Sequence, residues 1–337
     1  MTGPSLSAGS GMLHSGDPVA VAVRRWLAAE YLPVTAPLVV ACSGGADSLA
    51  LAAAVRVVAA DRPVSVATVD HGLQPGSAAV AQAVEMAARG LGYSRVDVLP
   101  VVVHGPGGTE AAARDARFAA LAALAASIGP DTAVLLAHTA DDQAETVLMG
   151  LARGSGPRSI AGMRPWRTPW GRPLLGVRRA DTETACAAAG LTPWQDPHNA
   201  NPSFTRVRLR REVLPLLEQV LGGGVAPALA RTAELMADDL AALDELADRA
   251  LGSAAPPDAG EALDCAELAR WPAAIRRRAL RSWVARRAGV TELTSRHLAR
   301  LDDLVTAGRT GAAVRLPGGS DVVRRRDRLA LVPGPRR

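Results

Sequence analysis

Lysine is absent from the 337-residue chain, so that all 38 basic residues are arginine. This absence excludes chemistries that need a protein lysine, such as a Schiff base, a lysine general base or a phosphate loop ending in Gly-Lys-Ser/Thr. Cysteine is also scarce, with three residues and no Cys-x-x-Cys pair, which excludes the spacing of an iron–sulfur or zinc-ribbon site. Scattered cysteines are typical of a reducing compartment, and we expect a cytoplasmic protein.

Long hydrophobic runs are missing as well. No uninterrupted apolar stretch reaches the roughly 18 residues that cross a bilayer. The N-terminal segment lacks the charged start and long apolar core of a secretory signal, so we expect no membrane segment. Aromatic residues make up only 3% of the chain, but 48% of the residues are hydrophobic, which provides a sizeable core and excludes global disorder.

Charge is divided unevenly along the chain. Residues 1–150 contain 8 Arg against 13 Asp and Glu, a net charge of −5. Residues 151–337 contain 30 Arg against 20 Asp and Glu, a net charge of +10. This asymmetry favours a polyanionic partner for the second half; arginine on solvated helices is the alternative that charge alone leaves open.

Strand and helix patterns alternate through the first half. Predicted strands occupy residues 37–42, 64–69, 96–103 and 132–137. Predicted helices occupy residues 19–31, 49–60, 77–91, 109–127 and 140–151. This alternation predicts an α/β fold, a doubly wound and mainly parallel sheet with helices on both faces. Residues 152–180 are rich in Gly, Pro and Arg and predict a loop, followed by a short helix at 181–189 and a strand near 191–195.

The pattern changes after Pro215. Long helical patterns occupy residues 225–251, 264–288 and 294–307, and a terminal β-hairpin is predicted to turn on Pro317-Gly318-Gly319. At about 100–200 residues per domain, the length predicts two domains. We therefore expect a disordered leader at residues 1–16, an α/β domain at 17–215 and a smaller, mainly helical domain at 216–337.

A glycine- and serine-rich segment follows the first predicted strand and opens the next helix. It consists of Ser43, Gly44, Gly45, Ala46, Asp47 and Ser48. Glycines let backbone N–H groups converge on one point, and a helix N-terminus adds positive potential, so the segment is typical of a phosphate cradle. Asp47 in such a site predicts a metal ion or a substrate donor beside the anion. A simple tight turn is the alternative.

Three further motifs carry polar residues at strand ends or on one helix face. Asp70 and His71 end the second strand, where either a ligand contact or a local turn is expected. Arg117 shares a helix face with Glu110 and Arg114, so it faces a ligand or takes part in Glu–Arg pairing within the helix. His138, Asp142 and Glu145 follow the fourth strand at i, i+4 and i+7. Together with Asp141, these residues could hold a cationic amine or a metal, or the acidic residues could simply partner the helix dipole.

The Ser-Gly-Gly-x-Asp-Ser segment resembles the signature of the PP-loop ATP pyrophosphatases. The resemblance implies that ATP is cleaved between its α- and β-phosphates and that Asp47 lies near Mg²⁺ and the pyrophosphate. It also implies ATP contacts for the whole Ser43–Ser48 loop, for Asp70 and His71, and for His138. ATP would lie outside the carboxyl ends of the strands.

The motifs together, continued by Arg153-Gly154-Ser155-Gly156, Trp194-Gln195-Asp196-Pro197-x-Asn199 and the segment 204–210, resemble the tRNA(Ile)-lysidine synthase family over roughly residues 19–215. The resemblance implies that ATP adenylates the first-anticodon cytidine of a CAU-reading isoleucine tRNA and that free L-lysine displaces AMP. It places lysine recognition on Asp142, Glu145 and Arg117. Together with Asp47, these are the expected catalytic residues.

By the same resemblance, Arg206, Arg208 and Arg210 would approach the tRNA or its reacting nucleotide. The family commonly has Arg-Asn-Arg-Ile-Arg here, whereas this chain has Arg-Val-Arg-Leu-Arg, which leaves the role of the Asn without a residue. Longer relatives carry a further C-terminal domain, so we expect the shorter form; a homodimer stays open. The alternatives are another PP-loop enzyme, such as a tRNA thiolase, an NAD synthetase or a GMP synthetase-like enzyme, and a non-catalytic RNA-binding protein.

Overall fold

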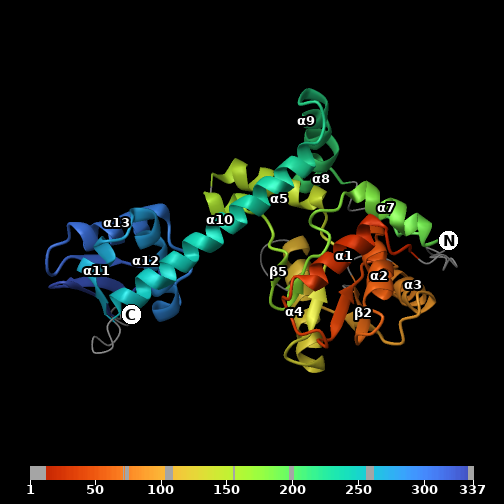
Figure 1. Cartoon of the computed structure of the whole chain (residues 1–337), viewed down its shortest axis with the longest axis horizontal. Coiled ribbons are helices and arrows are strands. Elements are labelled where there is room, and N and C mark those ends of the chain that lie inside the picture. Colours follow the sequence, from red (N-terminus) through yellow and green to blue (C-terminus); the bar gives the residue numbers. More distant parts are fainter. Residues whose placement is uncertain are drawn as a thin grey trace. The chain divides into compact units, whose positions relative to one another are not determined.

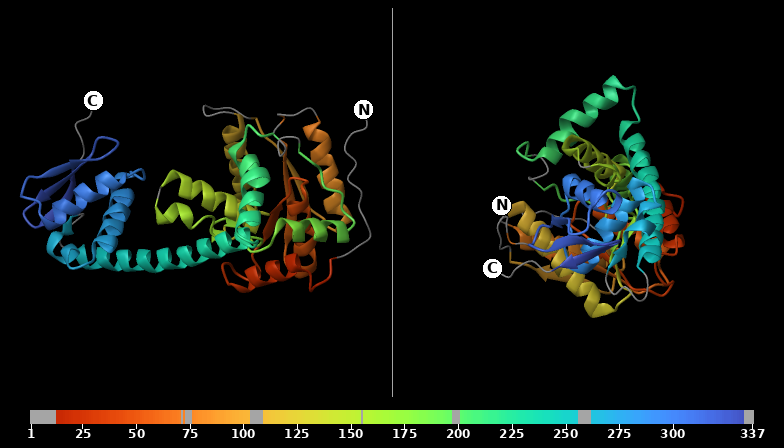
Figure 2. Two further views of the ribbon diagram at one scale, coloured as in Figure 1. Left: turned by 90° about the horizontal axis from the view of Figure 1, so that it is seen from above. Right: turned by 90° about the vertical axis from the view of Figure 1, so that its left-hand side faces the viewer.

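The computed structural model describes residues 13–70, 72, 76–102, 109–154, 156–196, 201–255 and 262–332. The chain forms two compact units, residues 1–237 and 238–337 (Figure 1, Figure 2). Of the expected leader, residues 1–12 lie outside the described residues. Leu13 is 4% exposed and belongs to the core beside helix α1 (Pro18–Ala28), so packed structure already begins at this residue.

The first unit is built on a sheet that has, among the described residues, six strands in the order β3-β2-β1-β4-β6-β5. The strands are β1 (Leu38–Ala41), β2 (Val64–Asp70), β3 (Val96–Pro100), β4 (Ala133–Leu135), β5 (Trp166–Arg167) and β6 (Trp170–Gly171). All neighbours pair in parallel except β5 and β6. The doubly wound, mainly parallel fold predicted from the sequence is therefore confirmed. The chain order of the strands reverses at β1 and β4, which makes the gap between them the switch point of the sheet.

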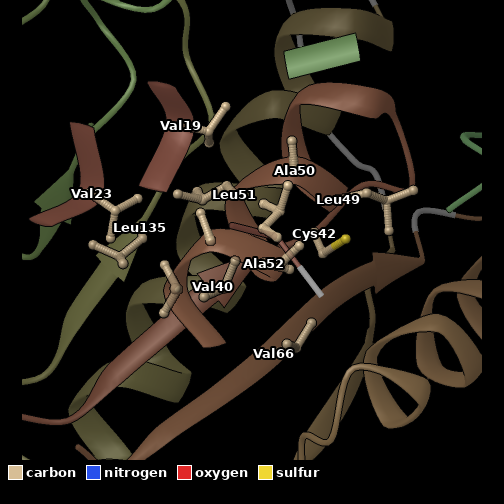
Figure 3. Packing of buried hydrophobic residues seen from close by; sticks show 14 of the residues in the cluster. Val19, Val23, Val40, Cys42, Leu49, Ala50, Leu51, Ala52, Val66 and Leu135 are labelled. Carbon is tan, nitrogen blue, oxygen red and sulfur yellow. The ribbon is translucent and has the colours of Figure 1, made fainter. Parts of the chain in front are cut away.

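Helices cover both faces of this sheet, as the apolar strands require. Leu38 and Val40 of β1 pack on one face into a cluster that contains residues of α1, α2 (Ala46–Val58), α3 (Ser77–Gly90) and α7 (Arg179–Ala188) (Figure 3). Val39 points to the opposite face and packs against α4 (Thr109–Ile128). Both surfaces of β1 are thus dry, and its carboxyl end is the part left for a ligand.

The predicted loop at residues 152–180 contains more structure than the sequence indicated. It includes the short helix α6 (Pro157–Ile160) and the strands β5 and β6, and β6 extends the sheet beside β4. Position 171 in β6 requires glycine, because a Cβ atom there would lie only 2.4 Å from Trp26 Cζ2. Two-residue strands are too short to give a periodic signal, which explains the error.

The strand predicted near residues 191–195 is wrong. The described residues of this segment form no strand, because the backbone binds the glycine-rich loop instead of a neighbouring strand. The N–H of Trp194 donates to the carbonyl oxygen of Gly44 at 2.9 Å.

Further helical elements follow in the first unit, and the last of them, α10, continues into the second unit. They are α5 (Ala140–Arg153), α8 (Thr205–Arg208), the π-helical turn η2 (Leu209–Val213), α9 (Leu214–Val220) and α10 (Val225–Ala254). No single helix among the described residues is long and apolar enough to span a membrane. Only the pair 205–220 and 225–254, bent by 96°, meets that length and composition test when both are counted together.

In the second unit the carboxyl half of α10 and three further helices pack against an antiparallel sheet that has, among the described residues, four strands in the order β7-β10-β9-β8. Its elements are β7 (Leu263–Asp264), α11 (Cys265–Ala269), α12 (Ala273–Ala288), α13 (Ser295–Thr306), β8 (Ala313–Arg315), β9 (Asp321–Arg325) and β10 (Arg328–Val332). The hairpin predicted at Pro317-Gly318-Gly319 joins β8 to β9 but is only part of this sheet. The single helix predicted at 264–288 is interrupted at Pro272, because proline cannot continue a helix.

Candidate active site

The glycine-rich loop connects β1 to α2 at the switch point of the sheet. Gly44 has φ +84°, and a Cβ atom there would lie 3.0 Å from Val84 Cγ2, so both its backbone and its surroundings require glycine. Gly45 is the N-cap of α2 and makes no side-chain capping bond. The first amide groups of α2 are therefore left without a side-chain acceptor, which is the arrangement that binds phosphate at a helix N-terminus.

Ser48 holds this loop closed from within. Its hydroxyl accepts from the Ser43 N–H at 3.1 Å and donates to the Gly45 carbonyl at 2.9 Å. Ser48 is buried, whereas Ser43 is exposed. The two serines of the motif thus differ: Ser48 shapes the loop, and Ser43 is available to a ligand.

Asp47 lies half-buried on the first turn of α2 and contacts two residues of α7. Its carboxylate accepts a hydrogen bond from the Thr182 hydroxyl and lies 3.5 Å from Arg179 Nη2. Burial raises the pKa of Asp47, although Arg179 and Thr182 act in the opposite direction. The loop carboxylate is therefore tied to α7, an element in which the sequence indicated no site residue.

Helix α5 begins with a capping box that fixes Asp142. The Asp142 Oδ2 atom accepts from the Thr139 N–H at 2.9 Å and from its hydroxyl at 3.1 Å. The neighbouring Asp141 pairs with Arg178 at 3.1 Å and accepts from the Arg179 N–H at 2.8 Å. The capping role considered for the acidic residues is thus present, and it uses only one oxygen of Asp142.

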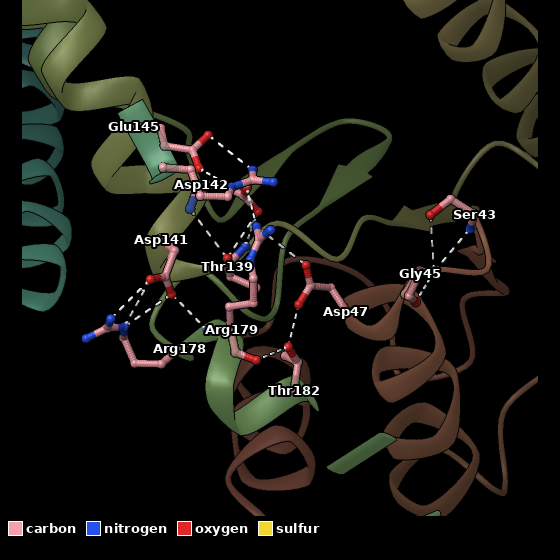
Figure 4. A network of polar contacts seen from close by, with 12 residues as sticks. Ser43, Gly45, Asp47, Thr139, Asp141, Asp142, Glu145, Arg178, Arg179 and Thr182 are labelled. Carbon is pink, nitrogen blue, oxygen red and sulfur yellow. Dashed lines mark hydrogen bonds and ion pairs between the residues drawn. The ribbon is translucent and has the colours of Figure 1, made fainter. Parts of the chain in front are cut away.

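The second oxygen of Asp142 belongs to a network in which two guanidinium groups join the carboxylates of Asp142, Glu145 and Asp47 (Figure 4). Asp142 Oδ1 accepts from Arg179 Nη2 at 2.8 Å and from Arg210 Nη2 at 3.3 Å. Glu145 is 0% exposed, and Arg210 binds both of its oxygens, through Nε at 2.7 Å and Nη2 at 3.3 Å. Arg210, predicted as a tRNA contact, therefore lies in the site.

Burial and the arginines act differently on the two carboxylates. Burial opposes ionisation of Asp142, but Arg179 and the Thr139 N–H outweigh it and lower the pKa of Asp142 below its usual range. Burial dominates at Glu145 and raises its pKa, although Arg210 acts against this effect. Asp142 is the more firmly ionised member of the pair.

His138 lies half-buried between β4 and α5. Burial, together with the nearby charges of Arg172, Arg114 and Arg117, lowers its pKa to about 4, although Asp142 favours the charged form. Its buried Nδ1 has no hydrogen-bond partner among the described residues. The imidazole is therefore neutral near pH 7 and retains an unused polar atom.

A cavity of about 410 Å³ opens at the carboxyl ends of β1 and β4 and collects most of the predicted site. Its lining includes Ser43, Gly45, Asp47, Ser48, Arg117, His138, Asp142 and Arg210. The residues Arg179, Trp194 and Asp196 also line it. The glycine-rich loop and the Asp142 carboxylate thus face one shared space.

Some predicted residues lie elsewhere. Gly44, Ala46, Asp70, Glu145, Arg206 and Arg208 are not part of the cavity wall, and His71 is outside the described residues. Asp70 accepts the Gly72 N–H at 3.1 Å, which is the local turn considered as its alternative. Arg208 is exposed and pairs with Glu212 at 3.1 Å.

Arg117 is exposed and places its guanidinium 5.7 Å from the centre of the Phe118 ring. Trp166 packs against Trp26, and Trp170 packs against Phe118.

Arg179 and Thr182 were not predicted as site residues from the sequence. Both lie on α7, more than 30 residues after the motif that contains His138, Asp142 and Glu145, and they reach Asp47 only through tertiary packing. The pair Arg178-Arg179 at the start of a short helix was the one visible signal, but spacing alone does not indicate which carboxylates such arginines meet.

The sheet order, the glycine-rich loop at the switch point and the cavity beside it define a PP-loop enzyme that uses ATP. The family model of the PP-loop domain matches residues 23–217. The family model of the TilS substrate binding domain matches residues 263–330. The chain belongs to the tRNA(Ile)-lysidine synthase family, as its relatives establish.

Two of these relatives are similar over nearly their whole length. The tRNA(Ile)-lysidine synthase of Nocardia farcinica is 57% identical over 92% of this chain and 96% of its own. That of Mycolicibacterium paratuberculosis is 56% identical over 91% of this chain and 89% of its own.

Among solved structures, the U34-tRNA thiolase NcsA of Methanococcus maripaludis has a TM-score of 0.54 at 16% identity, covering 65% of this chain and 78% of its own. That likeness supports the fold alone.

Proposed function

We propose that this chain joins free L-lysine to carbon 2 of the cytidine at the first anticodon position of a CAU-reading isoleucine tRNA, with conversion of ATP to AMP and pyrophosphate. One observation carries the proposal: the buried Asp142 lines the cavity that the glycine-rich loop also lines, and Arg210 of the same wall joins Asp142 to the buried Glu145. An amine of positive charge and a nucleotide can therefore meet there.

In this proposal the glycine-rich loop, residues 43–48, binds the phosphates of ATP. The uncapped start of α2 and the exposed Ser43 hydroxyl would hold the phosphates. The described residues contain no group of three or more His, Cys, Asp or Glu side chains that could hold a metal by themselves. Mg²⁺ commonly uses one or two carboxylates with substrate phosphates and water, so the single carboxylate of Asp47 fits it. When bound, the ion would neutralise charge on the phosphates.

The proposed reaction has two steps. The cytidine O2 atom attacks the α-phosphorus of ATP, and pyrophosphate leaves. The lysine Nε then attacks carbon 2, loses a proton, and AMP leaves with the oxygen. In this proposal Asp142 and Glu145 bind the amine, with Arg117 near the rest of the lysine. Glu145 is the better proton acceptor of the two, because burial raises its pKa while that of Asp142 is lowered.

In this proposal arginine side chains bind the tRNA. Arg206 and Arg208 precede the site on α8, and Arg208 is exposed, so they are suited to phosphate contacts. Residues 151–337 carry the positive charge of the chain and include the segment that matches the TilS substrate binding domain. Binding that relies on phosphate contacts weakens steeply with salt, because counterions are released on association.

The test uses purified protein, labelled lysine, Mg·ATP and an isoleucine tRNA transcript with a CAU anticodon. We expect label to enter the tRNA and AMP to form in equal amount. A transcript with U in place of the first anticodon C is the control and should accept none. Failure of well-folded protein to transfer lysine, with transfer of sulfur or ammonia instead, would contradict the proposal.

A further inference from the structure

Both carboxylates assigned to the lysine amine are already paired within the protein. Arg210 binds the two oxygens of Glu145 at 2.7 and 3.3 Å and also reaches Asp142 Oδ1 at 3.3 Å. Arg179 donates to the same Asp142 oxygen, and Thr139 occupies the other. An incoming ammonium group therefore finds no carboxylate oxygen of this pair without a protein partner.

The pairing of Glu145 with Arg210 has an energetic reason. A carboxylate that is 0% exposed is expensive to keep ionised without a counter-ion. Arg210 supplies this charge. It acts to lower the pKa of Glu145, although burial has the larger effect and the pKa remains raised. A lysine ammonium would supply the same charge to the same oxygens. Arg210 and the substrate amine are thus competitors for one site.

The position of Arg210 in the chain connects this competition to RNA. It lies in the π-helical turn η2, directly after α8, which carries Arg206 and Arg208. Single π-helical turns are frequent at functional sites. The Arg210 side chain is 27% exposed and lines the cavity, so it has space into which it can move.

We propose that Arg210 is a built-in occupant of the lysine site. Without RNA its guanidinium stands where the ε-ammonium is to bind, and tRNA phosphates that engage Arg206 and Arg208 draw the segment away and release the carboxylates. The inference rests on the proposed function and adds its regulation: lysine binds tightly only once tRNA is in place. A ligand shifts such an equilibrium only through its differential affinity for the two arrangements, which the contacts of Arg206 and Arg208 would provide.

The test compares lysine affinity by calorimetry, with and without the CAU transcript and without ATP. For the wild-type protein we expect the transcript to tighten lysine binding at least about tenfold, because only a minor fraction is open without it. Arg210→Gln should reach comparable affinity without RNA and gain little when RNA is added. Norleucine, which lacks the ε-amine, should not gain from the substitution, because only an ammonium competes with Arg210.

Two further variants control for the general effect of losing an arginine and for misfolding. Arg89→Gln breaks an exposed Arg–Glu pair, Arg89 with Glu85 at 2.8 Å, and should leave lysine affinity unchanged. Arg210→Lys retains a cation against Glu145, so it should fold even if Arg210→Gln does not, and should bind lysine with intermediate affinity because it loses the bidentate fork.

Wild-type affinity that is the same with and without the transcript would overturn the inference. A folded Arg210→Gln variant that binds lysine no more tightly than the wild type would overturn it as well. If the wild type transfers labelled lysine to tRNA in either case, only this inference fails. If it transfers none, the proposed function itself fails.

Discussion

Two buried carboxylates in this chain, one in each unit, stand between pairs of arginines. In the second unit Asp302 is 4% exposed; it accepts from Arg276 and, at 3.0 Å, from Arg277. In the first unit Asp142 is 8% exposed and accepts from Arg179 and Arg210. The pair chemistry is the same, so the ion pairs alone do not distinguish a structural cluster from a functional one.

The surroundings do distinguish them. Asp302 lies on α13, whose buried residues Leu301, Leu304 and Val305 belong to the core of the second unit. Asp142 lines a cavity, and two polar atoms near it, His138 Nδ1 and Arg179 Nε, have no hydrogen-bond partner among the described residues. A carboxylate–arginine cluster becomes a candidate site where it meets open space and unused polar atoms.

The largest effect should follow from breaking the cluster of the first unit. We expect Asp142→Asn to reduce lysine transfer about 10³-fold, because the amide keeps the size of the side chain but cannot balance an ammonium charge. ATP binding, measured by calorimetry, should persist. Asp302→Asn is the matched control, and its folded fraction should transfer lysine normally. Equal loss of ATP binding in Asp142→Asn would mean that this carboxylate serves the nucleotide.

Stability should show the reverse order. Asp302→Asn leaves Arg276 buried without its charge partner, and we expect a loss of about 3 kcal/mol in the unfolding free energy of the second unit. Asp142→Asn should lose less, because Arg179 retains Asp47 and Arg210 retains Glu145. Urea unfolding followed by Trp283, which lies in the second core, measures the former. Similar losses in both variants would remove the distinction drawn between the clusters.

His138 should give a pH signature confined to the first unit. Its pKa is about 4 in the folded state and near 6.5 when unfolded, so the unfolded chain binds more protons between these values. Stability contributed by the neutral imidazole is therefore present above pH 6.5 and is lost as the pH falls toward 4. We expect His138→Gln to reduce this acid-dependent loss by about 2 kcal/mol. Identical pH profiles of the two proteins would contradict the burial of a neutral ring.

The smallest effect concerns the loop. Gly44→Ala should weaken ATP binding roughly tenfold, since a left-handed alanine costs about 1–2 kcal/mol and its Cβ presses on Val84. Gly154→Ala, with φ +60° and nothing within 4 Å of its Cβ, has similar backbone strain away from the cavity and should leave ATP affinity unchanged. An equal loss in both would assign the effect to general strain.

Much of this architecture was predictable because its signals are local. Apolar runs such as 37–42 mark the strands, and motifs that follow the first and fourth strands must meet when those strands are neighbours in a parallel sheet. Asp47, His138 and Asp142 were assigned to one active site by the family resemblance, and in the structure all three line one cavity.

The remainder depends on tertiary packing. Nothing local indicates that Arg179 and Thr182 of α7 would reach Asp47, or that two residues suffice to form β6. Arg208 and Arg210 look equivalent in the sequence, yet one faces solvent and the other binds buried Glu145. Alternating arginines therefore predict a basic segment but not which member serves the site.

The central claim is that the nucleotide and amine halves of one cavity serve two successive steps. It is tested most directly by incubating the Asp142→Asn variant with the CAU transcript, lysine and Mg·ATP labelled in its α-phosphate. The account predicts that label accumulates on the tRNA as the adenylated intermediate, because the first step proceeds and the amine step does not. Absence of labelled tRNA from a folded variant that binds both ATP and tRNA would contradict it.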